Sequence, residues 1–310
     1  MRIIAGDIGG TKTLLRCVEA SGEISAEQRF ESGEFSSFDE LLRAFTGRCA
    51  GTIDAACFAV AGPVFDERAE VTNLGWKMAA RELSSAFSIA RVTLINDFYA
   101  IALGVPLLGE DDLLSLHKGR RAAKAPMAIL GAGTGLGQAN VVFDNDGDWT
   151  VIPSEGGHAD FAPQDERQTQ LLLRVIERHG HASWERVCSG MGLTNIYEFL
   201  TGRGEEPARI AELAEVGESA ALETFAMFVD IYGSEAGNMA LRVLARGGVF
   251  LAGGIAAKNV RFFADGRFIE AFLRKGRFRD VLEDVPVDLV VNEQVGLIGA
   301  VEGARRLVRN

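Results

Sequence analysis

Short apolar runs alternate with polar turns along the chain, as expected for an α/β protein. The first 30 residues predict a β-meander with one turn near Ser21–Glu23. Later apolar runs of about five residues end at glycine or at Asn-Asp, which is typical of buried strands. These runs are Ala55–Val60, Arg91–Ile95 and Gly248–Ala252.

Between the predicted strands, apolar residues recur at helical spacing. Gly233 and Gly237 lie one turn apart in one such segment, which indicates close packing of the backbone there. Gly180, between His179 and His181, is typical of a helix end, and we favour that interpretation over a metal site. Helices are predicted over residues 38–49, 98–108, 164–178, most of 207–244, and 296–307.

A glycine-rich turn follows an apolar run twice, at Gly6–Thr13 and at Gly131–Gly137. Each turn is followed by apolar sequence that predicts a second strand. The repetition indicates two related halves that face one another across a cleft. Without Cβ atoms, such turns let backbone N–H groups approach phosphate oxygens, and Thr11 and Thr134 each add a hydroxyl donor.

The alternative for these turns is a pair of tight hairpins without a ligand, since glycine is common wherever φ is positive. Threonine after glycine in both turns, with Asp7 in the first, favours phosphate binding. A Rossmann site fits poorly, because its fingerprint passes from a strand into a helix. A Walker A loop is absent, because neither turn closes with Gly-Lys-Ser or Gly-Lys-Thr.

Length and charge narrow the class of protein. A chain of 310 residues allows about two domains. We place the first at residues 1–109 with the C-terminal helix 296–310, and the second at 110–295, because residues 109–126 are polar and charged. The 43 acidic and 32 basic residues give a net charge of −11, which argues against nucleic acid or an anionic membrane as a partner.

The lack of an expected targeting signal and the spacing of the cysteines favour a cytoplasmic protein. Gly6 and Asp7 interrupt the first apolar run, so no signal peptide is expected, and no apolar stretch approaches the ~20 residues that span a bilayer. The cysteines lack CxxC spacing, which predicts reduced, mostly buried thiols. They are Cys17, Cys49, Cys57 and Cys188.

Asn96 and Asp97 end a predicted buried strand, where open α/β sheets commonly bind ligands. Beside a nucleotide, the Asp97 carboxylate suits a general base that acts on a hydroxyl nucleophile. The Asn96 amide can donate to and accept from a neighbouring hydroxyl. Taken alone, however, an Asn-Asp pair is more simply explained as ordinary turn chemistry.

The run Ser154–Phe161 changes that balance. Glu155 and His158 are separated by two glycines, so both side chains can reach one small polar ligand. Together they offer an acceptor and a donor to vicinal hydroxyls, as a sugar requires. The alternatives are a structural histidine or a metal site, and zinc is disfavoured because no further ligands occur at zinc spacing. Glu185 by itself is typical of a solvated helix carboxylate.

Together, five motifs resemble the ATP-dependent glucokinases of bacteria. The resemblance implies the duplicated actin-like ATPase (ribonuclease H-like) fold, with two α/β domains around a central cleft. The motifs occur in family order over nearly the whole chain. The runs Glu155–Phe161 and Ser189–Leu193 are much more specific than the glycine turns. The five motifs are Asp7–Thr11, Ile95–Phe98, Gly131–Gly137, Glu155–Phe161 and Gly248–Ile255.

The resemblance implies phosphoryl transfer from ATP to the 6-hydroxyl of glucose, the first step of glycolysis, in a homodimer. Asp97 would act as the general base, and Asp7 would orient Mg²⁺ through water. The remaining sugar hydroxyls would bind Asn96, Glu155, His158 and Glu185. ATP would bind Gly6, Asp7, Ile8, Gly9, Gly10, Thr11, Gly133 and Thr134 through its phosphates, and Gly253 and Gly254 through adenosine.

Related sugar kinases and regulators are the alternatives. Lys12 departs from the glucokinase pattern and is typical of the ROK sugar kinases, but their cysteine-rich zinc motif is absent between Cys57 and Cys188, so no zinc is expected. A kinase for another hexose or an N-acyl amino sugar remains open. A non-catalytic sugar-sensing regulator is less favoured, because a turn that starts at Gly6 leaves no room for a preceding DNA-binding domain.

Overall fold

The computed structural model describes residues 1–49, 51–71 and 73–309, which form two compact units. Unit 1 comprises residues 1–108 and 292–310, and unit 2 comprises residues 109–291. The chain therefore leaves unit 1 once and returns to it for the last helix, α13 (Val295–Arg309). No helix within the described residues is long and apolar enough to cross a membrane.

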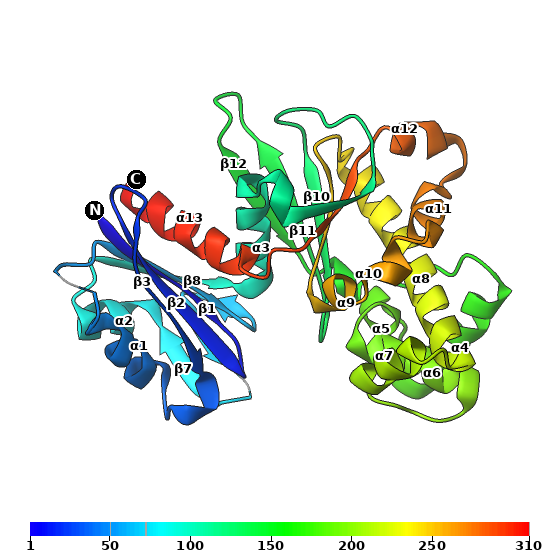
Figure 1. Ribbon diagram of the computed structural model, residues 1–310, viewed down its shortest axis with the longest axis horizontal. Coiled ribbons are helices and arrows are strands. Elements are labelled where there is room, and N and C mark those ends of the chain that lie inside the picture. The colour runs from blue at the N-terminus through cyan, green and yellow to red at the C-terminus, as the bar shows by residue number, and fades with distance from the viewer. Residues whose placement is uncertain (50, 72, 310) are drawn as a thin grey trace. The chain divides into compact units, whose positions relative to one another are not determined.

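Unit 1 is built on a five-stranded sheet with the order β3-β2-β1-β4-β8 (Figure 1). Strand β1 pairs antiparallel with β2 and parallel with β4. The predicted N-terminal meander is thus confirmed. The strands are β1 (Arg2–Ile8), β2 (Lys12–Glu19), β3 (Ile24–Glu31), β4 (Ala55–Val60) and β8 (Arg91–Asn96).

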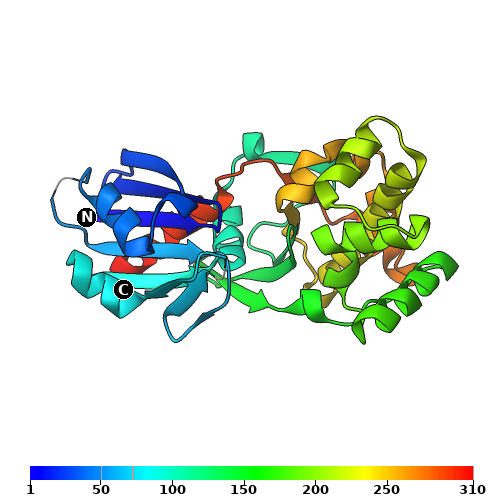
Figure 2. The same ribbon diagram turned by 90° about the horizontal axis from the view of Figure 1, so that it is seen from below.

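Each face of this sheet buries its own core, because successive side chains of a strand point to opposite faces. Ile4 of β1 packs in the core with α1 (Phe38–Thr46), whereas Ile3 packs in the core with α13 and α3 (Asp97–Gly104). Figures 1 and 2 show α1 and α13 on opposite sides of the sheet. The predicted free thiols are confirmed: three of the four cysteines are buried and Cys49 is half-buried.

Helices α13 and α3 pack with their backbones in contact. A Cβ atom on Gly299 would overlap the carbonyl oxygen of Ala100, and one on Gly104 would overlap that of Val295. Only glycine fits at either position. This contact brings the C-terminal helix onto β1 and β4, and β1 carries the candidate site residue Asp7.

Replacement of Gly299 by alanine tests this packing. Alanine normally stabilises a helix interior by up to about 1 kcal/mol relative to glycine. Here we expect Gly299→Ala to lower the free energy of unfolding by about 2 kcal/mol, because the added methyl group meets backbone. Gly33→Ala is the control, since its Cβ would meet nothing within 4 Å. Urea denaturation of both variants measures the difference, and a stable Gly299→Ala variant would contradict the packing.

Unit 2 repeats the strand order of unit 1. Its six-stranded sheet has the order β12-β11-β10-β13-β14-β9, so that β10 to β12 correspond to β1 to β3, and β13 and β14 to β4 and β8. The predicted pair of related α/β halves is therefore confirmed. The strands are β9 (Leu113–His117), β10 (Met127–Ala132), β11 (Leu136–Phe143), β12 (Trp149–Ser154), β13 (Gly248–Ala252) and β14 (Val287–Val290).

The long helix α8 (Ser219–Val243) organises the helices of unit 2, and it packs against α6 (Gly190–Thr201), α7 (Pro207–Glu215) and α11 (Arg267–Leu273). The predicted close packing at Gly233 and Gly237 is confirmed, because a Cβ atom on either would collide with backbone of α11. Helix α4 (Glu166–His179) ends at Gly180, whose φ of +75° confirms the predicted helix end.

Some predictions were incomplete. The α-helix predicted over 98–108 ends at Gly104 and continues as a 3₁₀ turn, Val105–Leu107, which contains Pro106. Proline lacks the N–H that a continuing helix needs. Residues 109–126, predicted as a polar connection, include β9, which pairs with β14 at the sheet edge. A small sheet of β5 (Val64–Phe65), β6 (Arg68–Val71) and β7 (Trp76–Ala79), followed by α2 (Ala80–Phe87), was not predicted.

Candidate functional site

Asp97 lies where β8 passes into α3. The side-chain oxygen of Asn96 caps this helix, accepting hydrogen bonds from the N–H groups of Phe98 and Tyr99 at 2.9 and 3.1 Å. The Asn96 amide donates to Asp97 Oδ1 at 2.9 Å and to the carbonyl oxygen of Gly62 at 3.1 Å. Asp97 Oδ1 also accepts from the N–H of Phe98 at 2.8 Å. These bonds fix the direction of the Asp97 carboxylate.

Asp7, near the end of β1, is close enough to Asp97 for the two carboxylates to interact. Burial, and then the charge of Asp97, raise the pKa of Asp7 to about 6. Burial also raises the pKa of Asp97, against the opposing effect of its hydrogen bonds from Phe98 and Asn96. No basic side chain in the described part of the chain contributes to either shift. Two carboxylates in this setting suit a divalent cation.

The first glycine turn joins β1 to β2. The N–H of Gly9 donates to the carbonyl oxygen of Lys12 at 2.9 Å, and Thr11 is exposed at the tip beside the partly exposed Gly10. Gly6 and Ile8 lie inside the unit instead: a Cβ on Gly6 would be 2.6 Å from the nearest side chain, and Ile8 is fully buried. Of the residues predicted to bind phosphate, Gly10 and Thr11 are therefore accessible in the turn, whereas Gly6 and Ile8 pack inside the unit.

The ionisation of Asp7 gives a pH-dependent test. A carboxyl group whose pKa is raised on folding contributes stability that is fully present at pH values below its pKa in the unfolded chain. This stability is lost as the pH rises through its pKa in the folded protein. With a shift from 3.8 to about 6, Asp7 lowers the stability of the ligand-free protein above pH 6 by up to about 3 kcal/mol.

We therefore expect Asp7→Asn to match the wild type in free energy of unfolding near pH 4 and to exceed it near pH 7. Denaturation in urea across this range, without nucleotide or magnesium, measures the difference. The same difference at both pH values would contradict the burial of an ionisable Asp7.

In unit 2 the structure brings three predicted sugar-binding residues together. His158 Nδ1 lies 3.8 Å from Glu185 Oε1, and His158 Nε2 lies 3.8 Å from Glu155 Oε2. Both distances exceed that of a hydrogen bond, so the groups remain able to bond a ligand. The Glu155 and His158 side chains are exposed, whereas that of Glu185 is 22% exposed. Glu185 is thus not the freely solvated carboxylate that its local sequence suggests.

Glu185, in α5 (Trp184–Val187), also connects this cluster to the second glycine turn. Its Oε2 accepts a hydrogen bond from the N–H of Leu136 at 3.0 Å, and a Cβ on Gly135 would be 2.5 Å from the same oxygen. The carbonyl oxygen of Gly133 accepts from the N–H of Gly190 at 2.8 Å. The predicted sugar and phosphate residues of unit 2, including Gly133 and the adjacent Thr134, therefore belong to one connected region.

Gly253 and Gly254 extend this region. They follow β13, the parallel neighbour of β10, and Gly254 begins α9 (Gly254–Lys258). Gly253 has a φ of +91°, and a Cβ atom there would be 2.7 Å from the carbonyl oxygen of Ala132. Because parallel strands end at the same sheet edge, the two glycines lie beside the second glycine turn.

Sequence reasoning missed polar residues behind this region. Gln138 in β11 and Glu235 in α8 are 2% and 0% exposed, and Gln138 Nε2 donates to Glu235 Oε1 at 3.0 Å. The available signal was a polar residue within an apolar strand or helix, since such residues are buried only when they have partners.

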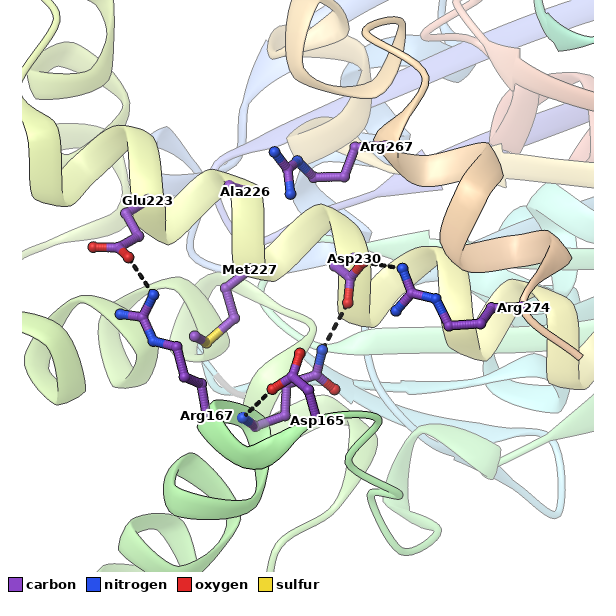
Figure 3. Close-up of a pocket in the computed structure, with 9 residues that line it drawn as sticks. Asp165, Arg167, Glu223, Ala226, Met227, Asp230, Arg267 and Arg274 are labelled. Carbon is purple, nitrogen blue, oxygen red and sulfur yellow. Dashed lines mark hydrogen bonds and ion pairs between the residues drawn. The ribbon is translucent and has the colours of Figure 1, made fainter.

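A surface pocket of about 480 Å³ lies elsewhere in unit 2, among α4, α8 and α11 (Figure 3). Much of its charge is paired internally: Arg167 with Glu223, and Arg274 with Asp230. None of the site residues predicted from the sequence lines this pocket. The candidate site residues of each unit therefore lie at its strand ends and glycine turns, not in this pocket.

Known proteins resemble the chain over almost its full length. The Glucokinase family model matches residues 4–307. A glucokinase of Trichormus variabilis is 40% identical over 340 aligned positions, which cover 98% of this chain and 99% of the relative. The crystal structure of a glucokinase from an Antarctic psychrotroph has a TM-score of 0.88 and 32% identity, covering 98% of this chain and 99% of that chain.

A more distant neighbour shares the fold alone. The ROK family glucokinase of Streptomyces griseus, solved in complex with glucose and AMPPNP, has a TM-score of 0.67 and 19% identity, over 99% of this chain and all of that chain. Together with the repeated strand order, these neighbours establish the actin-like ATPase fold for both units.

Proposed function

Since the chain belongs to the glucokinase family, we propose that it transfers the γ-phosphoryl group of ATP to the 6-hydroxyl of glucose, giving glucose 6-phosphate and ADP. It is an ATP-dependent hexose kinase and would serve the first step of glycolysis. The observation that carries the mechanism is the Asp97 carboxylate, half-buried directly after β8 and directed by Asn96.

Asp97 is the proposed general base. It accepts the proton of the 6-hydroxyl as the hydroxyl oxygen bonds to the γ-phosphorus and the bond to the β-phosphate oxygen breaks. The hydrogen bonds from Asn96 and Phe98 both end on Oδ1, which leaves Oδ2 to accept the proton. The raised pKa of Asp97 makes this carboxylate a stronger base than an exposed one.

The two glycine turns are proposed to bind the phosphates through backbone N–H groups and the hydroxyls of Thr11 and Thr134. Asp7 would hold Mg²⁺ through water, and the ion would neutralise charge on the transferring phosphate. The interaction of the Asp7 and Asp97 carboxylates supports this role, since no basic side chain of the described residues contributes to the pKa shift of either. Within the described residues no cluster of three acidic, histidine or cysteine side chains could hold a metal, which suits an ion bound largely by phosphate and water.

Sugar recognition is proposed for Asn96, Glu155, His158 and Glu185, because the last three converge in unit 2 with free hydrogen-bonding capacity. The distant neighbour that binds glucose and AMPPNP supports a sugar and a nucleotide as substrates. The family resemblance also supports a cytoplasmic homodimer. Sedimentation equilibrium tests whether the protein is a homodimer, because it distinguishes a mass of 33.3 kDa from twice that value.

Substitution of Asp97 tests the proposed base. We expect Asp97→Asn to lower kcat by at least about 10²-fold, because the amide cannot accept the hydroxyl proton. Glucose binding measured by calorimetry should be partly retained, since Asn keeps the shape of the side chain. A variant with kcat near that of the wild type would remove Asp97 from this role.

The sugar-binding residues have a different expected signature. We expect Glu155→Gln and His158→Ala to raise the KM for glucose about tenfold, with a smaller effect on the KM for ATP. The Gln variant loses the charge that strengthens a hydrogen bond to the sugar, and the Ala variant loses the hydrogen bond itself. Glu206→Gln, an exposed position at the start of α7, is the control and should leave both constants unchanged. An unchanged KM for glucose in both pocket variants would place these residues outside the sugar site.

A further inference from the structure

A buried carboxylate lies behind the turn that carries Glu155 and His158. Glu235, in α8, is fully buried, and Glu235 Oε1 accepts hydrogen bonds from Gln138 Nε2 at 3.0 Å and Arg242 Nη1 at 2.9 Å. Its Oε2 accepts from Asn238 Nδ2 at 2.9 Å. A buried charge is tolerated only with such partners, so this arrangement is strongly constrained.

The charge of Glu235 determines how the Gln138 amide is oriented. An ionised carboxylate can only accept hydrogen bonds, so Gln138 must present its NH₂ group to Glu235. The carbonyl oxygen of Gln138 then points the other way, against Gly156. A Cβ atom on Gly156 would overlap this oxygen, so the amide and the turn backbone are in direct contact.

The same turn rests on β11 at the next residue as well. A Cβ on Gly157 would overlap the carbonyl oxygen of Leu136, and Gln138 pairs in register with Ser154 in β12. Within the turn, the N–H of His158 donates to the carbonyl oxygen of Glu155 at 2.9 Å. The contact between Gly156 and the Gln138 amide therefore fixes the backbone from which the Glu155 and His158 side chains extend.

The other side of the carboxylate is anchored separately. Lys275 Nζ donates to Asn238 Oδ1 at 2.8 Å and to Ser234 Oγ at 3.1 Å, which ties this end of the network to the segment after α11. Arg242 is half exposed, and Gln138 is the partner of Glu235 that contacts the turn.

We propose that Glu235 is a positioning residue for sugar binding, which acts through Gln138 on the turn that holds Glu155 and His158. This inference rests on the proposed function, because it takes Glu155 and His158 as sugar ligands. Glu235 itself touches neither substrate. Its effect is to hold the amide of Gln138 in one orientation and so to fix the backbone at Gly156.

Steady-state kinetics of four variants test the proposal. We expect Gln138→Leu and Glu235→Met each to raise the KM for glucose about tenfold, with the KM for ATP changed less than about twofold, because only the sugar-binding turn is released. The double variant should be no worse than the more affected single variant, since both residues act through one contact. Arg242→Met, which removes another partner of Glu235 without touching Gln138, is the control and should change the KM for glucose less than about twofold.

Three results would overturn the proposal. They are additive effects of Gln138→Leu and Glu235→Met on the KM for glucose, equal increases in the KM for glucose and for ATP, and an increase in the KM for glucose in Arg242→Met as large as in Glu235→Met. If Glu235→Met does not fold, the proposal is still tested by comparing the KM for glucose of Gln138→Leu with that of Arg242→Met.

Hydrogen exchange separates this inference from the proposed function. In the ligand-free protein, Gln138→Leu should speed exchange in residues 154–161 and leave β13 unchanged. Unchanged exchange in residues 154–161 would overturn the positioning role. A wild type that exchanges as expected but phosphorylates no sugar would instead refute the proposed function.

Discussion

Two carboxylates, Asp7 and Asp97, interact in unit 1, and no basic side chain among the described residues contributes to the pKa shift of either. Parallel strands β1, β4 and β8 lie side by side in the sheet and end at the same edge, which brings Asp7 and Asp97 into one region. The return of α13 contributes to it, since a Cβ on Gly296 would be 3.3 Å from Asp7 Oδ2. The shared negative field raises the affinity of this region for protons, and in the proposed enzyme for a magnesium ion.

In unit 2, strand β11 brings the candidate site residues together, as the parallel strands do in unit 1. The backbone of Leu136 donates to Glu185, and its carbonyl oxygen lies against Gly157. One pleat further on, Gln138 joins Gly156 to the buried Glu235. The glycines of this unit therefore do more than allow turns. They let a strand, a turn and an ionised side chain approach closely enough for the Glu155, His158 and Glu185 side chains to share one region.

Local signals explain what could be predicted from the sequence. The glycine turns after apolar runs predicted both hairpins, and Gly180 predicted the end of α4, because each depends on neighbours in the chain. Strand β9 was missed because its short apolar run lies within a polar and charged connection, and it becomes an edge strand by pairing with β14. The approach of Glu185 to His158 depends on the bridge between Asp160 and Ser183, and the Gln138–Glu235 bond on packing of α8 behind the sheet. A polar residue within an apolar segment can indicate a buried polar partner, but one sequence does not show which distant residue that partner is.

The most direct test of the account is sugar-dependent ADP release with Mg-ATP, measured in parallel on glucose, mannose, fructose, N-acetylglucosamine and no sugar. The account predicts strong turnover on glucose, little on the other sugars, and almost none without sugar. Turnover confined to another sugar would contradict the assignment of the sugar-binding residues. Glucose binding without turnover on any sugar would contradict the central claim, that this chain is a kinase with Asp97 as its base.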